Sequence, residues 1–247
     1  MRRLITWQID GKKYSAELSL NKLPYRVKKH QSVLLRKLGD TDMLLQHNKV
    51  KNLRIAIKNI NGVIIYPGET FSFCKLVGLP TIRKGYVEGM ELSGGKARPG
   101  IGGGICQIAN LINWLAMHSP LTITERRHHS FDPFPDDNRV LPFGSGAAVF
   151  YNYIDYQLTN TTSHTFQINL WLTDKLLEGE LRISEELPYA YHVHEKNHEF
   201  IKDGDRYYRK NEIWRKKIDK YKSGKELAVE LIAKNFAEVK YIPEQFK

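Results

Sequence analysis

The feature that most constrains this chain is a run of glycines that leads directly into a helical pattern. Residues 97–120 read ARPGIGGGICQIANLINWLAMHSP, in which Gly102, Gly103 and Gly104 lie just before Cys106. Apolar residues then recur three and four positions apart, which is the spacing of one helix face, and a proline at position 120 requires the helix to end before it. The sequence therefore predicts a glycine-rich loop over residues 95–104, followed by a helix.

The rest of the chain predicts an α+β fold. The N-terminal half is mixed and holds the glycine loop that leads into a central helix, whereas the C-terminal half is β-rich and antiparallel. A hairpin is expected around Asp10-Gly11, a helix over residues 48–61 and a strand interrupted at Pro67-Gly68. From Ala147 onward, alternating apolar residues and polar turns predict strands, including one over residues 226–242. We expect three parts: an N-terminal α/β segment (1–47), a core domain (48–185) and a β-rich C-terminal extension (186–247).

Cys106 lies where a helix would favour a reactive thiol. A helix N-terminus carries unpaired N–H groups and a partial positive charge, which stabilise a thiolate. The backbone amides of the glycine loop could converge on one anion, as in an oxyanion hole, and Gln107 could add a donor. Cys106 lies off the apolar face, beside Asn110 and Asn113, so we expect its thiol to face a boundary or a cleft.

A nucleophilic cysteine needs a general base, and the strand expected after the helix offers two histidines. His128 and His129 are adjacent and would face opposite sides of a strand, so at most one belongs to a catalytic site. We prefer His129 because it leads toward Asp132, which could orient the imidazole. Cysteine, histidine and then an acid is the chain order of papain-like and transglutaminase-like enzymes, an analogy of order and position only.

Simpler interpretations compete with a thiol site. A glycine loop before a helix is often a tight connection, and a lone cysteine in an amphipathic helix is most often a small buried hydrophobe. Several nearby residues are also of types that bind metals, namely Cys106, His118, His128, His129 and Asp132. No pair of them has the close spacing of a zinc motif, so we expect no metal. The glycine run lacks the lysine and hydroxyl of a phosphate-binding loop, and we expect no cofactor. Cys74, in the alternating TFSFCK, is expected to be structural.

Composition limits the partners and the compartment. The formal net charge of +11 could attract an anionic surface, but no nucleic-acid module accompanies it, so we expect no nucleic-acid partner. No apolar run approaches the roughly 20 residues of a transmembrane helix, and the first residues lack the apolar core of a signal peptide. With only two cysteines, the chain suits a reducing compartment. We expect a cytoplasmic protein, or one bound at the inner face of the membrane.

Three stretches of the chain resemble the VanW family. They contain the motifs PGETFSF (67–73), GGGICQ (102–107) and HHSF (128–131), and the resemblance is strongest from Asn48 to Trp214. It implies a link to the bacterial cell envelope and to glycopeptide resistance, with a cell-wall precursor or peptide as the partner. Membership of this family does not by itself imply that the protein confers resistance.

The resemblance also carries residues over. The family's core motif falls on the three glycines, Cys106 and Gln107, and its His-Ser step falls on His129 and Ser130. Longer relatives have an aspartate at the position of Gly146, so Asp132 is the acid candidate that remains nearby.

Two hypotheses follow. In the first, Cys106 attacks an acyl or amide carbonyl, His129 is the base, Asp132 orients it, and the glycine amides with Gln107 hold the oxyanion. His128 and Ser130 then belong to the surrounding binding site. In the second, the chain is a non-catalytic binding or accessory module, and Cys106 only packs.

Overall fold

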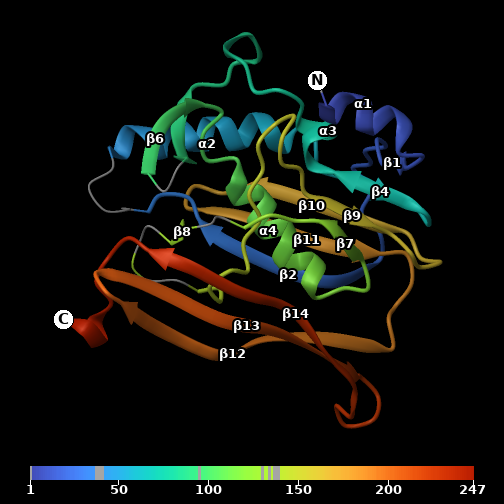
Figure 1. Cartoon of the computed structure of the whole chain (residues 1–247). Coiled ribbons are helices and arrows are strands. Elements are labelled where there is room, and N and C mark those ends of the chain that lie inside the picture. The colour runs from blue at the N-terminus through green and yellow to red at the C-terminus, as the bar shows by residue number, and fades with distance from the viewer. Residues whose placement is uncertain (1, 37–41, 94–95, 129–130, 133–134, 136–139) are drawn as a thin grey trace.

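The computed structural model describes the whole chain except residues 1, 37–41, 94–95, 129–130, 133–134 and 136–139. The described residues form helices and several sheets (Figure 1), which confirms the α+β class. The helices are α1 (Arg2–Ile9), α2 (Met43–Ile57), α3 (Phe73–Val77) and α4 (Cys106–Met117), with 3₁₀ turns at Ile82–Lys84 and Glu244–Phe246. Within the described ranges, no helix is long and apolar enough to cross a membrane.

Two four-stranded sheets form the body of the molecule. Their strand orders are β1-β4-β9-β7 and β2-β11-β10-β3. The first consists of β1 (Lys13–Tyr14), β4 (Glu69–Ser72), β9 (Gln157–Thr159) and β7 (Thr122–Glu125). The second consists of β2 (Tyr25–Val33), β11 (Leu176–Ile183), β10 (Phe166–Leu172) and β3 (Val63–Ile65). Because β1 and β2 both precede residue 48, the N-terminal segment supplies an outer strand to each sheet.

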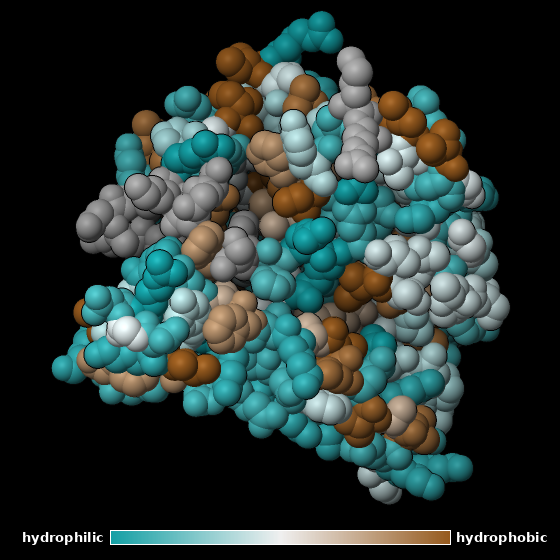
Figure 2. Space-filling view, in the orientation of Figure 1, coloured by the Kyte–Doolittle hydropathy of each residue, from teal (hydrophilic) through white to brown (hydrophobic). Residues whose placement is uncertain are grey.

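A third sheet is built mainly from the last 60 or so residues, as the sequence pattern predicts. It is ordered β12-β13-β14-β8, with β12 (Tyr189–Asp203), β13 (Arg206–Asp219), β14 (Glu226–Val239) and β8 (Phe131–Asp132). Turns at Gly204 and at Ser223-Gly224 reverse the chain with positive φ angles. In the view of Figure 2 the surface over this sheet is mainly hydrophilic, with separate hydrophobic patches.

Helix α4 lies between the second sheet and the third, which we call the C-terminal sheet (Figure 1). Ile108, Ile112 and Leu115 are buried in the main core. On another side, Trp114 and Met117 pack against Ile213 of β13 in a smaller cluster. The helix ends at Met117, before Pro120, so the predicted central helix is confirmed.

The hairpin expected around Asp10-Gly11 is wrong. Residues 2–9 form α1 instead, and β1 pairs in parallel with β4. Long-range contacts hold the helix: Trp7 is buried with its ring 6.1 Å from that of Tyr151, and Arg3 binds Glu125 at 2.5 Å. Tertiary contacts such as these override local propensity.

The loop expected over residues 95–104 is wrong for its first part. β6 (Lys96–Ile101) pairs with β5 (Glu88–Ser93) as an antiparallel hairpin, in which Gly100 stands opposite Gly89. The glycines fit a strand because other backbone lies close by: a Cβ on Gly89 would meet the carbonyl oxygen of Gly103 at 2.4 Å. The glycines are needed here because neighbouring backbone segments pass too close to leave room for side chains. The loop itself is only the short stretch before α4.

Candidate functional site

The glycines before Cys106 stand where the backbone passes close to other parts of the chain. A Cβ on Gly103 would lie 2.2 Å from the carbonyl oxygen of Gly89, and one on Gly104 would lie 2.1 Å from Cγ of Lys49. Gly102 and Gly104 also have φ angles of 83° and 92°, which side-chain-bearing residues rarely adopt. The loop is therefore held by close packing against β5 and α2.

Two of the three loop amides already have partners inside the fold. Gly102 donates to the carbonyl of Val87 and Gly103 to that of Gly100, both at 3.0 Å. Asn52 of α2 also donates to the carbonyl of Gly103 at 3.0 Å. These two amides would have to give up their present partners to bind an anion. Their convergence on an anion, which the sequence suggested, stays a prediction.

Cys106 begins a polar stripe along α4 that also contains Asn110 and Asn113. Each side chain of the stripe bonds to the backbone of residues 145–149. The bonds are Cys106 Sγ to the Val149 carbonyl (3.6 Å), the Ala147 amide to Asn110 Oδ1 (2.7 Å) and Asn113 Nδ2 to the Ser145 carbonyl (2.6 Å). The stripe therefore fastens this segment to the helix. That explains why the strand expected from Ala147 is reduced there to single bridges, since its backbone bonds to side chains instead of a neighbouring strand.

The pKa of the Cys106 thiol is raised. Burial of the sulfur is the main cause, and the negative charge of Glu91 adds to it, although the residue as a whole is partly exposed. A helix N-terminus alone would lower this pKa. Loss of water from the sulfur outweighs the helix dipole, so the thiol form is favoured.

The acid proposed for the catalytic set has a charged partner on the C-terminal sheet. Asp132 is buried, and its Oδ2 lies 3.2 Å from Nη1 of Arg209 on β13. The guanidinium of Arg209 lies over the rings of Phe143 and Phe200, at 4.8 and 5.0 Å. His128 is exposed. His129 and Ser130 lie outside the described residues, so the pairing of Cys106 with His129 stays a prediction.

Gln107 faces β2. Its Nε2 donates to Ser32 Oγ at 2.8 Å and to the Val33 carbonyl at 2.9 Å. Both amide donors are thus used to join α4 to the second sheet. The same amide group is the one that the sequence assigned to an oxyanion.

A buried lysine beside the glycine loop was missed by the sequence reasoning. Lys49 of α2 is 7% exposed, its stem packs on Gly104, and its Nζ donates to Gln46 Oε1 at 2.8 Å. Burial, and then the charge of Arg36, lower the pKa of Lys49 to about 8. The spacing of Gln46, Lys49 and Asn52 could have indicated a buried polar face, but Val50 and its apolar neighbours gave an equally regular pattern.

The metal-ligand types named from the sequence are not gathered in one place. His118 directly follows α4, so it lies about 18 Å along the helix from Cys106. In the part of the chain that the structure describes, no three His, Cys, Asp or Glu side chains group as metal ligands.

Comparisons with known proteins match the chain to one family. Residues 48–182 match the family described as VanW like protein. The chain is 31% identical over 211 residues to "Vancomycin B-type resistance protein VanW" of Enterococcus faecalis (strain ATCC 700802 / V583), covering 85% of this chain and 77% of that protein. It is also 31% identical over 112 residues to "Uncharacterized protein YoaR" of Bacillus subtilis (strain 168), covering 44% of this chain and 34% of that protein. No solved structure matches.

Proposed function

Since the chain belongs to the VanW family, we propose that it is a non-catalytic binding or accessory module of the bacterial cell envelope, linked to glycopeptide resistance. The printed name of its Enterococcus faecalis relative, a vancomycin B-type resistance protein, supports the link to resistance. The module would bind an envelope component, such as a cell-wall precursor or peptide, or a partner protein.

One observation carries the choice of a non-catalytic role. The Cys106 thiol donates to the Val149 carbonyl, and its burial raises the thiol pKa. Only the thiolate is a nucleophile. A thiol that stays protonated and donates a hydrogen bond therefore suits a structural role better than a catalytic one. The parallel roles of Asn110 and Asn113 in the same stripe support this reading.

A thiol enzyme is the second candidate. It is favoured by the place of Cys106, the first residue of α4, directly behind the glycine loop and partly exposed. In that mechanism Cys106 attacks an acyl or amide carbonyl, His129 accepts its proton and Asp132 orients the histidine. The mechanism requires Cys106 to leave Val149 and to lose its proton near neutral pH.

The pH dependence of Cys106 alkylation separates the two candidates. We would label the Cys74→Ala protein with iodoacetamide between about pH 6 and pH 10 and locate the adduct by mass spectrometry. A binding module predicts slow labelling, with an apparent pKa above the usual value of ~8.5. The matched control is the Cys74→Ala, Cys106→Ser protein, which should not be labelled.

Rapid labelling with an apparent pKa well below that value would overturn the non-catalytic role. The thiol-enzyme candidate then predicts that His129→Ala removes the shift and that His128→Ala does not. Labelling that appears only in denaturant would support a structural cysteine.

A further inference from the structure

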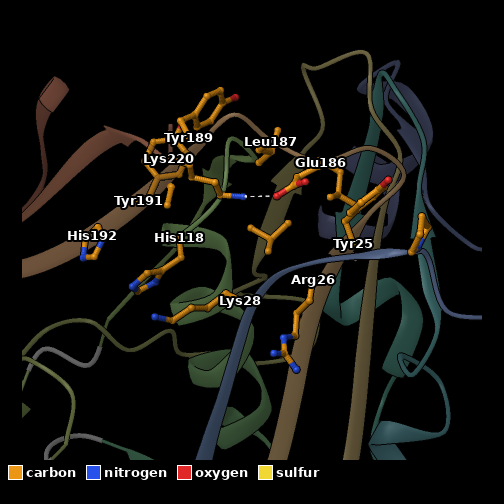
Figure 3. A pocket seen from close by; sticks show the side chains of 14 residues that line it. Tyr25, Arg26, Lys28, His118, Glu186, Leu187, Tyr189, Tyr191, His192 and Lys220 are labelled. Carbon is orange, nitrogen blue, oxygen red and sulfur yellow. Dashed lines mark hydrogen bonds and ion pairs between the residues drawn. The ribbon is translucent and has the colours of Figure 1, made fainter. Parts of the chain in front are cut away.

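A cavity of about 420 Å³ lies at the opposite end of α4 from Cys106. Its walls come from the start of β2, the residue after α4, the connection into β12, the start of β12 and the turn after β13 (Figure 3). Its volume is in the range of small-ligand sites. Of its lining residues, only His118 lies within residues 48–182, so the family match does not describe this cavity.

The charges that line the cavity do not balance. Lys220 Nζ lies 3.4 Å from Glu186 Oε1, so these two form an ion pair across the rim (Figure 3). Arg26 and Lys28 also line the cavity, and neither forms an ion pair with a carboxylate of the described residues. Within the described part of the chain, these two positive charges therefore have no carboxylate partner.

A bulge in β2 directs Lys28 inward. Arg26 pairs with Arg182 and Lys28 pairs with the preceding Leu181, so Val27 is the additional residue. As a result Val27 and Lys28 are both partly buried, whereas Lys29 is exposed on the other face. Bulges commonly redirect side chains next to binding sites.

The titratable groups whose pKa values the charge of Lys28 shifts are histidines, His118 and His30, which can only add positive charge. Burial lowers the pKa of Lys28. Burial also lowers the pKa of His118 to about 4, and the charges of Lys28, His192 and His30 contribute to that shift. In Figure 3 the end of Lys28 extends toward the ring of His118, with His192 beyond it. Glu186 is paired with Lys220, so a partly desolvated Lys28 that forms no ion pair with a described carboxylate favours an anionic ligand.

Two tyrosines supply an aromatic wall. Tyr189 and Tyr191 meet edge to face with ring centroids 5.6 Å apart. Lys217 lies 3.7 Å from the ring centroid of Tyr189, and Arg215 lies 4.3 Å from that of Tyr191. Burial raises the pKa of Tyr191 to about 12, so its hydroxyl stays protonated and can donate to an anion.

We propose that this cavity binds the phosphoryl group of a small phosphorylated organic molecule, with Lys28 as its anchor and the Tyr189–Tyr191 wall against the organic part. A phosphoryl group fits better than a carboxylate because it carries more negative charge and its three oxygens accept more donors. The cavity is remote from Cys106, so this inference stands whether Cys106 is structural or catalytic.

Calorimetry on the full chain with four probes tests the proposal. The probes are phenyl phosphate, inorganic phosphate, benzoate and phenol at pH 7.5. We expect phenyl phosphate to bind most tightly, with benzoate and inorganic phosphate about tenfold weaker and phenol weaker still. Lys28→Gln should weaken phenyl phosphate binding by about tenfold or more, because the anchoring charge is lost.

Lys29→Gln is the matched control. Lys29 is the next residue on β2, but it pairs with Glu178 at 2.6 Å on the outer face, so its loss should leave binding unchanged. The proposal is overturned if no probe binds, if phenol binds as tightly as phenyl phosphate, or if both variants weaken binding equally. Equal binding of phenyl and inorganic phosphate would overturn the role of the aromatic wall, and equal binding of benzoate would overturn the preference for a phosphoryl group.

Discussion

Cys106 and His118 lie at the two ends of α4. Burial shifts the pKa of each in the direction that favours its neutral form. The pKa of the thiol rises and that of the imidazole falls. Lys49, beside the glycine loop, follows the same rule. At each of these residues loss of water outweighs the nearest dipole or partner, which a sequence pattern does not reveal.

His118 makes the protein sensitive to acid. Its folded pKa is about 4, and its unfolded value is near 6.5. Folding therefore gains stability from neutral His118 above pH 6.5, and this contribution is lost as the pH falls toward 4. We expect the free energy of unfolding to lose about 3 kcal/mol over this interval through His118 alone.

Urea unfolding of the wild type and of His118→Phe at several pH values measures that loss. Phenylalanine keeps a ring against Trp114, whose centroid lies 4.7 Å from that of His118. The difference in stability between the two proteins should be constant above pH 7 and should shift in favour of the variant as the pH falls below 6.5. A difference that does not change with pH would contradict a buried neutral His118.

At the scale of the element, periodicity predicts those parts whose partners are close in sequence. Helix α4 was predicted because its apolar spacing and Pro120 mark both the face and the end. Strands β12 to β14 form a meander, so each alternating run has its partner next to it. Helix α1 could not be predicted in this way, because the residues that hold it, Glu125 and Tyr151, are more than 100 positions away.

The candidate site, too, could be predicted only where the residues concerned are close in sequence. The spacing of Cys106, Asn110 and Asn113 placed them on one helix face, and the structure confirms this. What covers that face is residues 145–149, and nothing in the sequence pattern pairs this segment with the helix. The sequence therefore predicted only that the thiol faces a boundary or a cleft, and not that it bonds to the carbonyl of Val149.

Gly103 tests whether the glycine loop is held by packing. Its Cβ would lie 2.2 Å from the Gly89 carbonyl oxygen, which is backbone and cannot rotate away. Gly103→Ala must separate the loop from β5, and we expect a loss of stability of about 2 to 3 kcal/mol in urea unfolding.

Gly11→Ala is the comparison. Gly11 has a φ of 66° and open space around its Cβ, so alanine there causes only backbone strain, about 1 kcal/mol. If Gly103→Ala destabilises the protein no more than Gly11→Ala, close packing does not hold the loop.

At the scale of the whole molecule, the C-terminal sheet is bound to the body through polar contacts as well as the Trp114–Ile213 cluster. Asn211 donates to the Phe143 carbonyl and Arg215 to the Ser119 carbonyl, both at 2.8 Å. These bonds satisfy carbonyls at the ends of loops and of α4. Contacts of this kind favour unfolding of the body and the sheet as one unit.

Asp132 on β8 and Arg209 on β13 form a buried ion pair within the C-terminal sheet, which helps to hold the short strand β8 in it. Both side chains are buried, so replacing Asp132 takes a negative charge away from the buried guanidinium of Arg209. We expect Asp132→Asn to lower the free energy of unfolding by about 3 kcal/mol. Glu199→Gln, which breaks the exposed pair with Lys210, should change it by less than about 1 kcal/mol.

The same variant distinguishes the two roles suggested for Asp132. If the carboxylate acts mainly through Arg209, Asp132→Asn lowers stability and leaves the rate of Cys106 alkylation in the folded protein unchanged. The double variant Asp132→Leu, Arg209→Met should then recover part of the lost stability, because both charges of the buried pair are removed together. If Asp132 instead orients a catalytic histidine, alkylation slows at neutral pH while stability changes little, and a mainly structural role for the Asp132–Arg209 pair is wrong.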